Sequence, residues 1–170
     1  EPAAGSVTRG GEIGYLPQDP RTGDLDVLGR DRILSARGLD ELARRMRIMS
    51  ERMADPDESQ RDRAMKRYAS AEAEFITRGG YAAESEAAAI ASSLSLPERV
   101  LNQPLGTLSG GQRRRIELAR ILFSGAETLL LDEPTNHLDA DSIVWLRDFL
   151  KAHRGGLIVI SHDVDLLKAA

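Results

Sequence analysis

The chain has 170 residues, of which 41% are hydrophobic and 29% charged, a composition that fits a folded globular domain and excludes a disordered one. It contains no cysteine, which excludes disulfide frameworks, thiol catalysis and cysteine-based zinc sites. It has no run of about 18 apolar residues, which excludes a membrane-spanning helix, and its three scattered histidines argue against a histidine-only metal site. The formal net charge of −4 argues against a protein that coats nucleic acid with its whole surface, although it allows a local basic patch.

Neither end of the chain has the character of a natural terminus. The chain opens at Glu1 without a methionine and closes at Ala170, so we expect a piece of a longer protein. No segment resembles a signal peptide or a transit peptide, which favours the cytoplasm.

Three short apolar runs predict the strands of an α/β fold. Residues 12–16 form a strand-like run that Pro17 stops, and residues 128–131 and 157–160 are apolar without alternation. Continuous runs of this kind are typical of strands buried on both faces of a parallel sheet. A helical pattern over 141–152 separates the last two runs, which predicts a βαβ unit with a right-handed crossover.

The middle of the chain predicts two helices that pack on each other. Apolar residues recur at spacings of three and four over 39–53 and again over 64–75, a break at Asp55-Pro56-Asp57 separates the two patterns, and Gly79-Gly80 ends the second. The simplest interpretation is an antiparallel helical hairpin over residues 39–78, and the alternative is two ordinary surface helices packed on the sheet. The seam residues are Leu39, Leu42, Met46, Met49 and Met53, followed by Ala64, Tyr68, Ala71 and Phe75.

Charge is unevenly distributed along this hairpin. Residues 44–67 hold eight basic and five acidic groups, a net charge of +3, so the rest of the chain carries −7. A solvated helix face is the ordinary explanation for such a segment. A basic tip on an acidic body is also what binding to a polyanion such as RNA requires.

Two carboxylates follow the predicted strand at 128–131. Asp132 and Glu133 therefore lie at the carboxyl end of a parallel strand, where open α/β sheets bind their ligands. In that place Asp132 would hold Mg²⁺ through water, and Glu133 would orient and deprotonate the water that attacks a γ-phosphate. A pair of solvated carboxylates at a strand end is the alternative.

The segment Ser109-Gly110-Gly111-Gln112 precedes a predicted helix over 113–123. Ser109 is a good N-cap, and two glycines let a ligand approach the backbone closely. The free N–H groups and the helix dipole suit a phosphate. Three arginines at 113–115 stand where the dipole disfavours cations, so we expect them to meet negative charge, with pairing of Arg113 to Glu117 as the alternative.

Two further polar residues follow predicted strands. Gln18 comes after the strand at 12–16 and is placed to reach a metal ion or a water molecule, and His162 comes after the strand at 157–160, where an imidazole could contact a γ-phosphate. Taken alone, each would be an ordinary polar residue at a strand end.

The order and spacing of these motifs resemble the nucleotide-binding domain of the ATP-binding cassette superfamily. The resemblance covers nearly the whole chain and implies a partial P-loop ATPase core with a parallel sheet, together with a helical lobe that carries the signature motif. The family's strand order implies that the strands at 12–16 and 157–160 flank a central strand at 128–131. Gln18 resembles the Q-loop glutamine, 108–112 the signature motif, 129–134 the Walker B motif with the catalytic base directly after it, 138–139 the D-loop, and His162 the switch histidine.

Within this superfamily the chain looks like an ABC-F ATPase, and most like actinobacterial members labelled as macrolide-resistance ATPases. The residues that carry this resemblance are Thr135-Asn136-His137-Leu138-Asp139 and the long insertion between Gln18 and Leu108. ABC-F proteins carry such an insertion, the arm, in the first of two cassettes on one chain. The resemblance thus implies a partial ATPase core at 1–38 and 128–170, a signature lobe at 79–127 and the arm at 39–78.

The resemblance also implies the ligands and partners. The cofactors are ATP and Mg²⁺, the latter held by Gln18 and Asp132 largely through water, and the partners are the second cassette and the ribosome near the tRNA exit site. Gln18, Asp132, Glu133 and His162 would serve the cassette's own ATP. Ser109, Gly110 and Gly111 would serve the ATP that the partner cassette holds, and Gln112 and Asp139 are further expected nucleotide-binding residues.

The chain departs from the family pattern at one point. A P-loop requires Gly-x-x-x-x-Gly-Lys-[Ser/Thr], and none of the 15 glycines is followed by lysine. We therefore expect the P-loop strand to be missing from this fold, and the isolated chain to be inactive although the longer protein hydrolyses ATP. The alternatives are the ATPase subunit of a membrane transporter, a DNA-repair or chromosome-organising ATPase, and a binding module without catalysis.

Overall fold

The fold is a small parallel sheet joined to a larger helical part. The structure, a computed structural model, describes residues 11–17 and 24–168. Strands β1 (Ile13–Leu16), β2 (Thr128–Asp132) and β3 (Gly156–Ile160) lie in the order β1-β2-β3, all parallel, with Leu16 paired to Leu131 and Asp132 to Ile160. The predicted strands are confirmed, and the strand at 128–132 is the central one, as expected.

One face of the sheet is buried, whereas the other is open. Leu129 and Leu131 of β2 join the same buried cluster as Leu146 and Leu150, which α7 (Ala140–Ala152) contributes. On the opposite face Ile160 is 61% exposed, and Ile13, Tyr15 and Ile158 are also exposed. The prediction of strands buried on both faces is therefore wrong for this chain, because no helix among the described residues covers that face.

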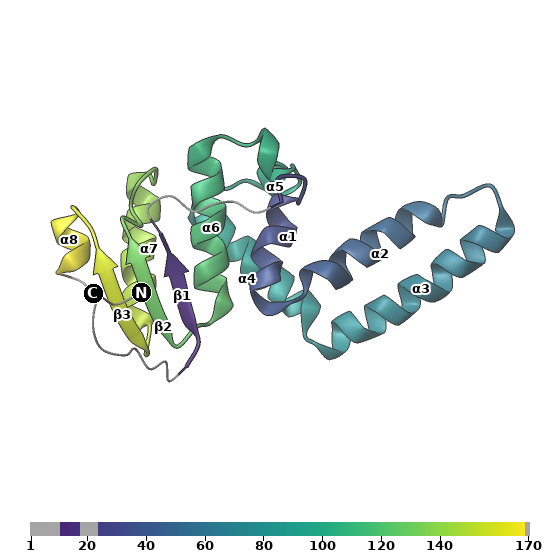
Figure 1. Cartoon of the computed structure of the whole chain (residues 1–170), viewed down its shortest axis with the longest axis horizontal. Coiled ribbons are helices and arrows are strands. Elements are labelled where there is room, and N and C mark those ends of the chain that lie inside the picture. The colour runs from purple at the N-terminus through teal and green to yellow at the C-terminus, as the bar shows by residue number, and fades with distance from the viewer. Residues whose placement is uncertain (1–10, 18–23, 169–170) are drawn as a thin grey trace, which may run out of the picture.

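Most of the remaining helices build the other side of the molecule, whereas α8 lies beside β3 (Figure 1). None of the helices in the described parts of the chain is both long enough and apolar enough to cross a membrane. In chain order they are α1 (Gly29–Leu34), a 3₁₀ turn (Ser35–Arg37), α2 (Asp40–Arg52), α3 (Glu58–Thr77), α4 (Gly80–Ser93), α5 (Glu98–Leu101), a second 3₁₀ turn (Leu105–Thr107), α6 (Gly110–Ser124) and, after the last strand, α8 (Val164–Leu167).

Helices α2 and α3 pack along each other and project away from the sheet (Figure 1). Their apolar seams meet through Leu42 and Met46 on α2 and through Ala71 and Phe75 on α3, all of which are buried. The seam residues belong to the main core cluster, so the base of the hairpin is continuous with the body. The two helices occupy the segments that the periodicity predicts, and they form a projecting pair rather than a layer on the sheet.

Each end of this hairpin is marked by a glycine in the left-handed region. Gly38, just before α2, has φ 64°, and Gly79, just after α3, has φ 70°. A side chain at either position would be strained, since non-glycine residues rarely adopt this conformation. The two glycines therefore let the chain turn into and out of the hairpin.

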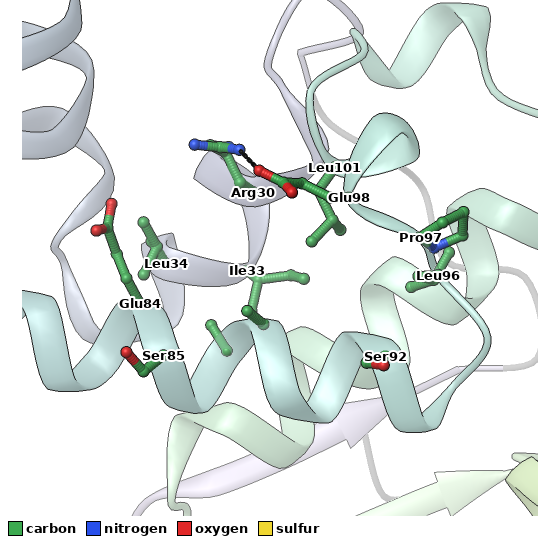
Figure 2. A pocket seen from close by; sticks show the side chains of 12 residues that line it. Arg30, Ile33, Leu34, Glu84, Ser85, Ser92, Leu96, Pro97, Glu98 and Leu101 are labelled. Atoms are coloured by element: carbon green, nitrogen blue, oxygen red, sulfur yellow. Dashed lines mark ion pairs between the residues drawn. The ribbon is translucent and has the colours of Figure 1, made fainter.

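A hollow of about 420 Å³ lies between α1, α4 and α5, away from the sheet (Figure 2). Its lining includes the apolar side chains of Ile33 and Leu101, and Arg30 faces Glu98 across it with 3.8 Å between Nη2 and Oε1. Glu84 also lines this hollow, and burial raises the pKa of its carboxyl, with a smaller opposing effect of Arg30.

We predict that Gly79→Ala destabilises the protein by about 1 kcal/mol, the cost of a left-handed conformation for a residue with a Cβ. An added Cβ meets nothing within 4 Å, so the change isolates the backbone effect. Gly79→Asn is the control because asparagine tolerates this region. Denaturant unfolding measures both variants, and equal stability of the alanine variant and the parent sequence would contradict the prediction.

Candidate functional site

The carboxyl ends of the three strands bring the predicted catalytic residues together. Glu133 follows β2 and His162 follows β3, and because the strands are parallel both lie at the same edge of the sheet. The backbone N–H of His162 donates to Oε2 of Glu133 at 3.3 Å, and Nε2 of His162 lies 3.4 Å from Oε1. Glu133 is only 7% exposed, whereas the imidazole of His162 is 99% exposed and accessible to a ligand.

The backbone of Glu133 holds the carboxylate in this place. Its φ is 47°, a conformation that costs a non-glycine residue about 1 kcal/mol or more. Its N–H donates to the carbonyl oxygen of Ile160 at 2.7 Å, which continues the ladder between β2 and β3 by one residue. The turn after β2 therefore directs the side chain of Glu133 toward β3 and His162.

Asp132 ends β2 and is half-buried beside Glu133. Within residues 11–17 and 24–168, no group of three or more histidine, aspartate or glutamate side chains is placed to hold a metal ion. A single carboxylate at a ligand-facing edge suits Mg²⁺, which keeps several waters and is held by one or two carboxylates together with substrate phosphates. The donor chemistry thus fits Mg²⁺, whereas Gln18, the other predicted ligand, lies outside the described residues.

The predicted phosphate-binding segment forms the start of α6. Ser109 caps this helix: its Oγ accepts from the N–H of Gln112 at 3.2 Å, and its own N–H donates to Oε1 of Gln112 at 2.9 Å. This capping box satisfies two backbone donors that would otherwise be free. A Cβ at Gly110 would meet nothing within 4 Å, so its backbone remains open to a ligand.

The second glycine of this segment lies next to His137. A Cβ at Gly111 would lie 3.4 Å from Cβ of His137, itself in the left-handed region with φ 68°. The Asn136-His137 pair that distinguishes this chain is therefore in contact with the start of α6. The sequence pattern identifies both segments, but it does not show that they touch.

The arginines at the start of α6 bind carbonyl oxygens of the chain itself. Arg114 is buried and donates to the carbonyl oxygens of Asp132 at 2.6 Å and Glu133 at 3.2 Å, and also to that of Pro17. Arg113 donates to the carbonyl oxygen of Leu108, and Arg115 to those of Leu94 and Ser95. These hydrogen bonds go to carbonyl dipoles of the neighbouring strand ends and turns. Beside the stronger effect of hydrogen bonds from Ser95 and Ser142, the charge of Arg115 also helps to lower the pKa of Asp139, so the expectation that these arginines meet negative charge is confirmed for Arg115.

Of the three arginines that the sequence singles out, Arg114 has a role that the sequence did not show, since it joins α6 to the ends of β1 and β2. The alternative pairing of Arg113 with Glu117 is also wrong. Glu117 is instead bound by Arg32 from α1 and by Arg120 from its own helix.

Asp139 uses both of its carboxylate oxygens within the chain. It caps α7, where Oδ1 accepts from the N–H of Ser142 at 2.9 Å, and Oδ2 accepts from Oγ of Ser95 at 2.5 Å. The hydrogen bond from Ser95, followed by those from Ser142, lowers the pKa of Asp139 to about 2. The structure thus gives this residue a structural role, since its hydrogen bonds are made with Ser95 and Ser142 and not with Glu133.

The basic side chains of the hairpin divide into paired and unpaired groups. Arg44 and Arg45 bind Glu41, Arg47 binds Asp31, and Arg61 donates to backbone carbonyls. Four exposed side chains, which we call the hairpin basic group, have no ion pair within the described parts of the chain. The hairpin basic group consists of Arg52, Arg63, Lys66 and Arg67.

Comparison with known proteins gives one family match and several relatives. A family profile described as ABC transporter matches residues 5–136. The chain is 40% identical over 172 residues to the tylosin resistance ATP-binding protein TlrC of Streptomyces fradiae, and 36% identical over 155 residues to the energy-dependent translational throttle protein EttA of Haemophilus influenzae. These matches cover 95% and 89% of this chain but only 30% and 27% of the relatives, so the chain spans less than a third of their length.

Solved structures support the fold alone, because their sequences are distant. A dimeric post-hydrolysis state of the ATP-binding cassette MJ0796 bound to ADP and Pi matches with a TM-score of 0.54 at 22% identity, over 94% of this chain and 56% of that one. An archaeal ribosome recycling factor, aABCE1, in complex with the ribosomal stalk protein aP1, matches with a TM-score of 0.59 at 17% identity, over 99% of this chain and 25% of that one. These matches confirm the predicted α/β ATPase fold class.

We predict that Ser95→Ala raises the pKa of Asp139 from about 2 toward its ordinary value of 3.8, because the variant lacks the hydrogen bond that lowers it most. A lowered carboxyl pKa stabilises the fold at pH values above the unfolded pKa, and this contribution is lost as the pH falls from 3.8 toward 2. The variant's loss of stability should therefore be largest above pH 4 and disappear near pH 2.

Carboxyl NMR titration measures the pKa, and thermal unfolding against pH measures the stability. Ser93→Ala is the control, because the hydroxyl of Ser93 donates to a carbonyl within its own helix and does not contact Asp139. An unchanged pKa of Asp139 in Ser95→Ala would contradict the assignment.

Proposed function

The chain belongs to the ABC transporter family, as its motifs predict, and from this we propose that it is part of an ABC-F ATPase which couples ATP binding and hydrolysis to action on the ribosome. The observation that supports the ATPase most directly is the contact of Glu133 with His162 at the ligand-facing edge of the sheet. TlrC and EttA, whose names concern antibiotic resistance and translation, support the ribosome as the target.

In this proposal the sheet edge serves the cassette's own ATP. Glu133 accepts a proton from the attacking water, and His162 contacts the γ-phosphate with its exposed imidazole while its backbone N–H holds the carboxylate of Glu133. Asp132 and Gln18 would hold Mg²⁺ largely through water, and the ion would neutralise charge on the phosphates. The buried position of Glu133 keeps its carboxylate fixed before a ligand arrives.

The start of α6 serves the ATP of a second cassette. Gly110 and Gly111 present backbone N–H groups, and Ser109 its hydroxyl, at the positive end of a 15-residue helix, which favours a phosphate. Gln112 closes the capping box and so fixes the orientation of this segment. The partner is thus the second ATP-binding domain of the parent protein, by which we mean the longer protein that contains this chain.

The cradle for the α- and β-phosphates must come from elsewhere in the parent protein, since the 170 residues contain no P-loop pattern. We propose that the isolated chain does not hydrolyse ATP and that the parent protein does. The open sheet face, and a sheet to which the described residues contribute only β1, β2 and β3, are consistent with this proposal.

The projecting hairpin is the proposed arm. It carries the hairpin basic group toward its outer end, on a chain whose net charge is negative. Free guanidinium and ammonium groups bind phosphates of a nucleic-acid backbone, whereas paired ones contribute little. We place the contact on the ribosome in the region of the tRNA exit site, which implies that the parent protein works in the cytoplasm.

We predict that Glu133→Gln in the parent protein keeps ATP binding and lowers turnover by at least about 100-fold, because an amide cannot accept the proton of the attacking water. The amide oxygen can still accept the N–H of His162, so the fold should be retained. Glu127→Gln, at an exposed glutamate just before β2, is the control. Turnover of Glu133→Gln at the parental rate would show that the base is wrongly assigned.

The same variant tests the target. ATP-trapped Glu133→Gln protein should sediment with ribosomes in ATP and not in ADP, because closure around ATP is expected to create the binding form. If the protein sediments with ribosomes in neither ATP nor ADP, the ribosome is not its target, and the alternative of a membrane-transporter subunit is favoured.

We predict that the triple variant Arg63→Gln/Lys66→Gln/Arg67→Gln weakens ribosome binding and reduces its salt dependence. Each phosphate contact contributes about 0.7–0.9 to the slope of log affinity against log salt, so the slope should fall by roughly two to three units. Arg44→Gln/Arg45→Gln is the control, since both arginines are already paired with Glu41. An equal loss of ribosome affinity in the two variants would show that the hairpin basic group is not the specific contact surface.

A further inference from the structure

Helix α6 is tied to α1 by a buried carboxylate. Glu117 lies in the middle of α6 and is 2% exposed. Arg32 of α1 binds it through two hydrogen bonds, Nε to Oε1 at 2.5 Å and Nη2 to Oε2 at 3.2 Å, and Arg120 adds a third at 2.9 Å. A two-pronged guanidinium contact of this kind fixes orientation as well as distance.

The neighbouring residue of α1 ties this helix to the hairpin. Asp31 is 4% exposed and accepts two hydrogen bonds from Arg47 of α2, Nη2 to Oδ2 at 2.6 Å and Nη1 to Oδ1 at 3.3 Å. Asp31 and Arg32 are adjacent on a helix of only six residues, so α1 cannot rotate without moving both contacts. The same short helix therefore holds α6 through Arg32 and α2 through Asp31.

The base of the hairpin packs on the main core cluster, and glycines form its chain connections to the body. Its two chain connections run through Gly38 and Gly79, whose φ values of 64° and 70° lie in a region that only glycine adopts easily. The outer part of the hairpin extends beyond the body, where no other element supports it (Figure 1). A contact that fixes the angle of α2 near its base thus has a large effect at the outer end.

Stability alone does not explain these buried charges. A buried ion pair loses about as much free energy on desolvation as it gains from attraction, so its clearest contribution is to a unique geometry. The seam between α2 and α3 is already apolar and would hold the hairpin together without Asp31 or Arg47. The Asp31–Arg47 pair joins α1 to α2 and takes no part in the packing of α2 against α3.

We propose that Glu117–Arg32 and Asp31–Arg47 act together as a positioning link that transmits movement of α6 to the hairpin. This link rests on the proposed function, because α6 begins with the segment that would contact the second cassette's ATP. When closure around ATP shifts the start of α6, Glu117 moves Arg32, α1 turns as a unit, and Asp31 moves Arg47 and α2. These four side chains are positioning residues that do not contact nucleotide or ribosome.

The test measures the hairpin's orientation directly in the parent protein. The chain has no cysteine, so spin labels at Ser50→Cys on α2 and Asp148→Cys on α7 report one distance once any other cysteines of the parent are replaced. The decisive variant is Asp31→Asn/Arg47→Gln, which removes both charges and leaves groups that can still hydrogen-bond. Its matched control is Glu41→Gln/Arg45→Gln, which removes the same two charges from an exposed pair within α2.

Distances are recorded in ATP and in ADP, with Glu133→Gln present to prevent turnover. We expect the mean distance to differ between the nucleotides in the unmodified protein and in the control. In Asp31→Asn/Arg47→Gln the difference should vanish and the distance distribution should become about twice as wide. An unchanged distribution in this variant, or no nucleotide-dependent difference in the unmodified protein, would overturn the link.

A second pair of variants covers failure of the first to fold. Arg47→Lys keeps the charge but cannot make both hydrogen bonds to Asp31, so it should widen the distribution whereas Arg45→Lys should not. In Asp31→Asn/Arg47→Gln, ribosome-stimulated ATP hydrolysis should fall at least 5-fold, while basal ATP hydrolysis should stay within 2-fold of the unmodified protein. An equal fall of the stimulated and the basal activity would overturn the link. The distance measurements need no ribosome. If the parent protein does not bind ribosomes, the proposed function is wrong, but the distances still test this link.

Discussion

The arrangement of the site depends on the guanidinium of Arg114. This guanidinium extends from near the start of α6 to the carbonyl oxygen of Pro17, just after β1, and to those of Asp132 and Glu133 at the end of β2. Those oxygens belong to the ligand-facing edge of the sheet, so one buried cation fixes the start of α6 relative to Asp132 and Glu133. Carbonyl oxygens at strand ends lack ladder partners, and a buried guanidinium satisfies several of them at once.

Beyond this junction, specific polar contacts connect α6 to α1 and α1 to the hairpin, above an apolar core. Glu117 connects α6 to α1, and Asp31 connects α1 to the hairpin. Close to the same junction the aliphatic and aromatic residues of α6, α1 and α4 form one contiguous cluster. Apolar packing has little directional preference, whereas each two-pronged guanidinium contact relates two helices through a defined geometry.

The open face of the sheet shows where periodicity was a misleading guide. The runs at 128–131 and 157–160 have the continuous apolar character of strands covered on both sides, but only one face is covered here. A strand's composition reflects every surface it meets in the protein where it evolved. The described residues supply a covering layer for one face alone, which agrees with a chain that spans less than a third of its relatives.

The sequence by itself determined the local elements and the identity of the motifs. Strand positions follow from short apolar runs, the hairpin from spacings of three and four, and the start of α6 from Ser109 and its glycines, because these signals depend on neighbours in the chain. The strand order came instead from the family resemblance. Tertiary structure alone decided that Arg114 binds carbonyl oxygens, that Asp139 binds Ser95 and that Asp31 holds Arg47. Each of these contacts joins residues from separate elements, and a charged side chain offers many partners until folding brings one within reach.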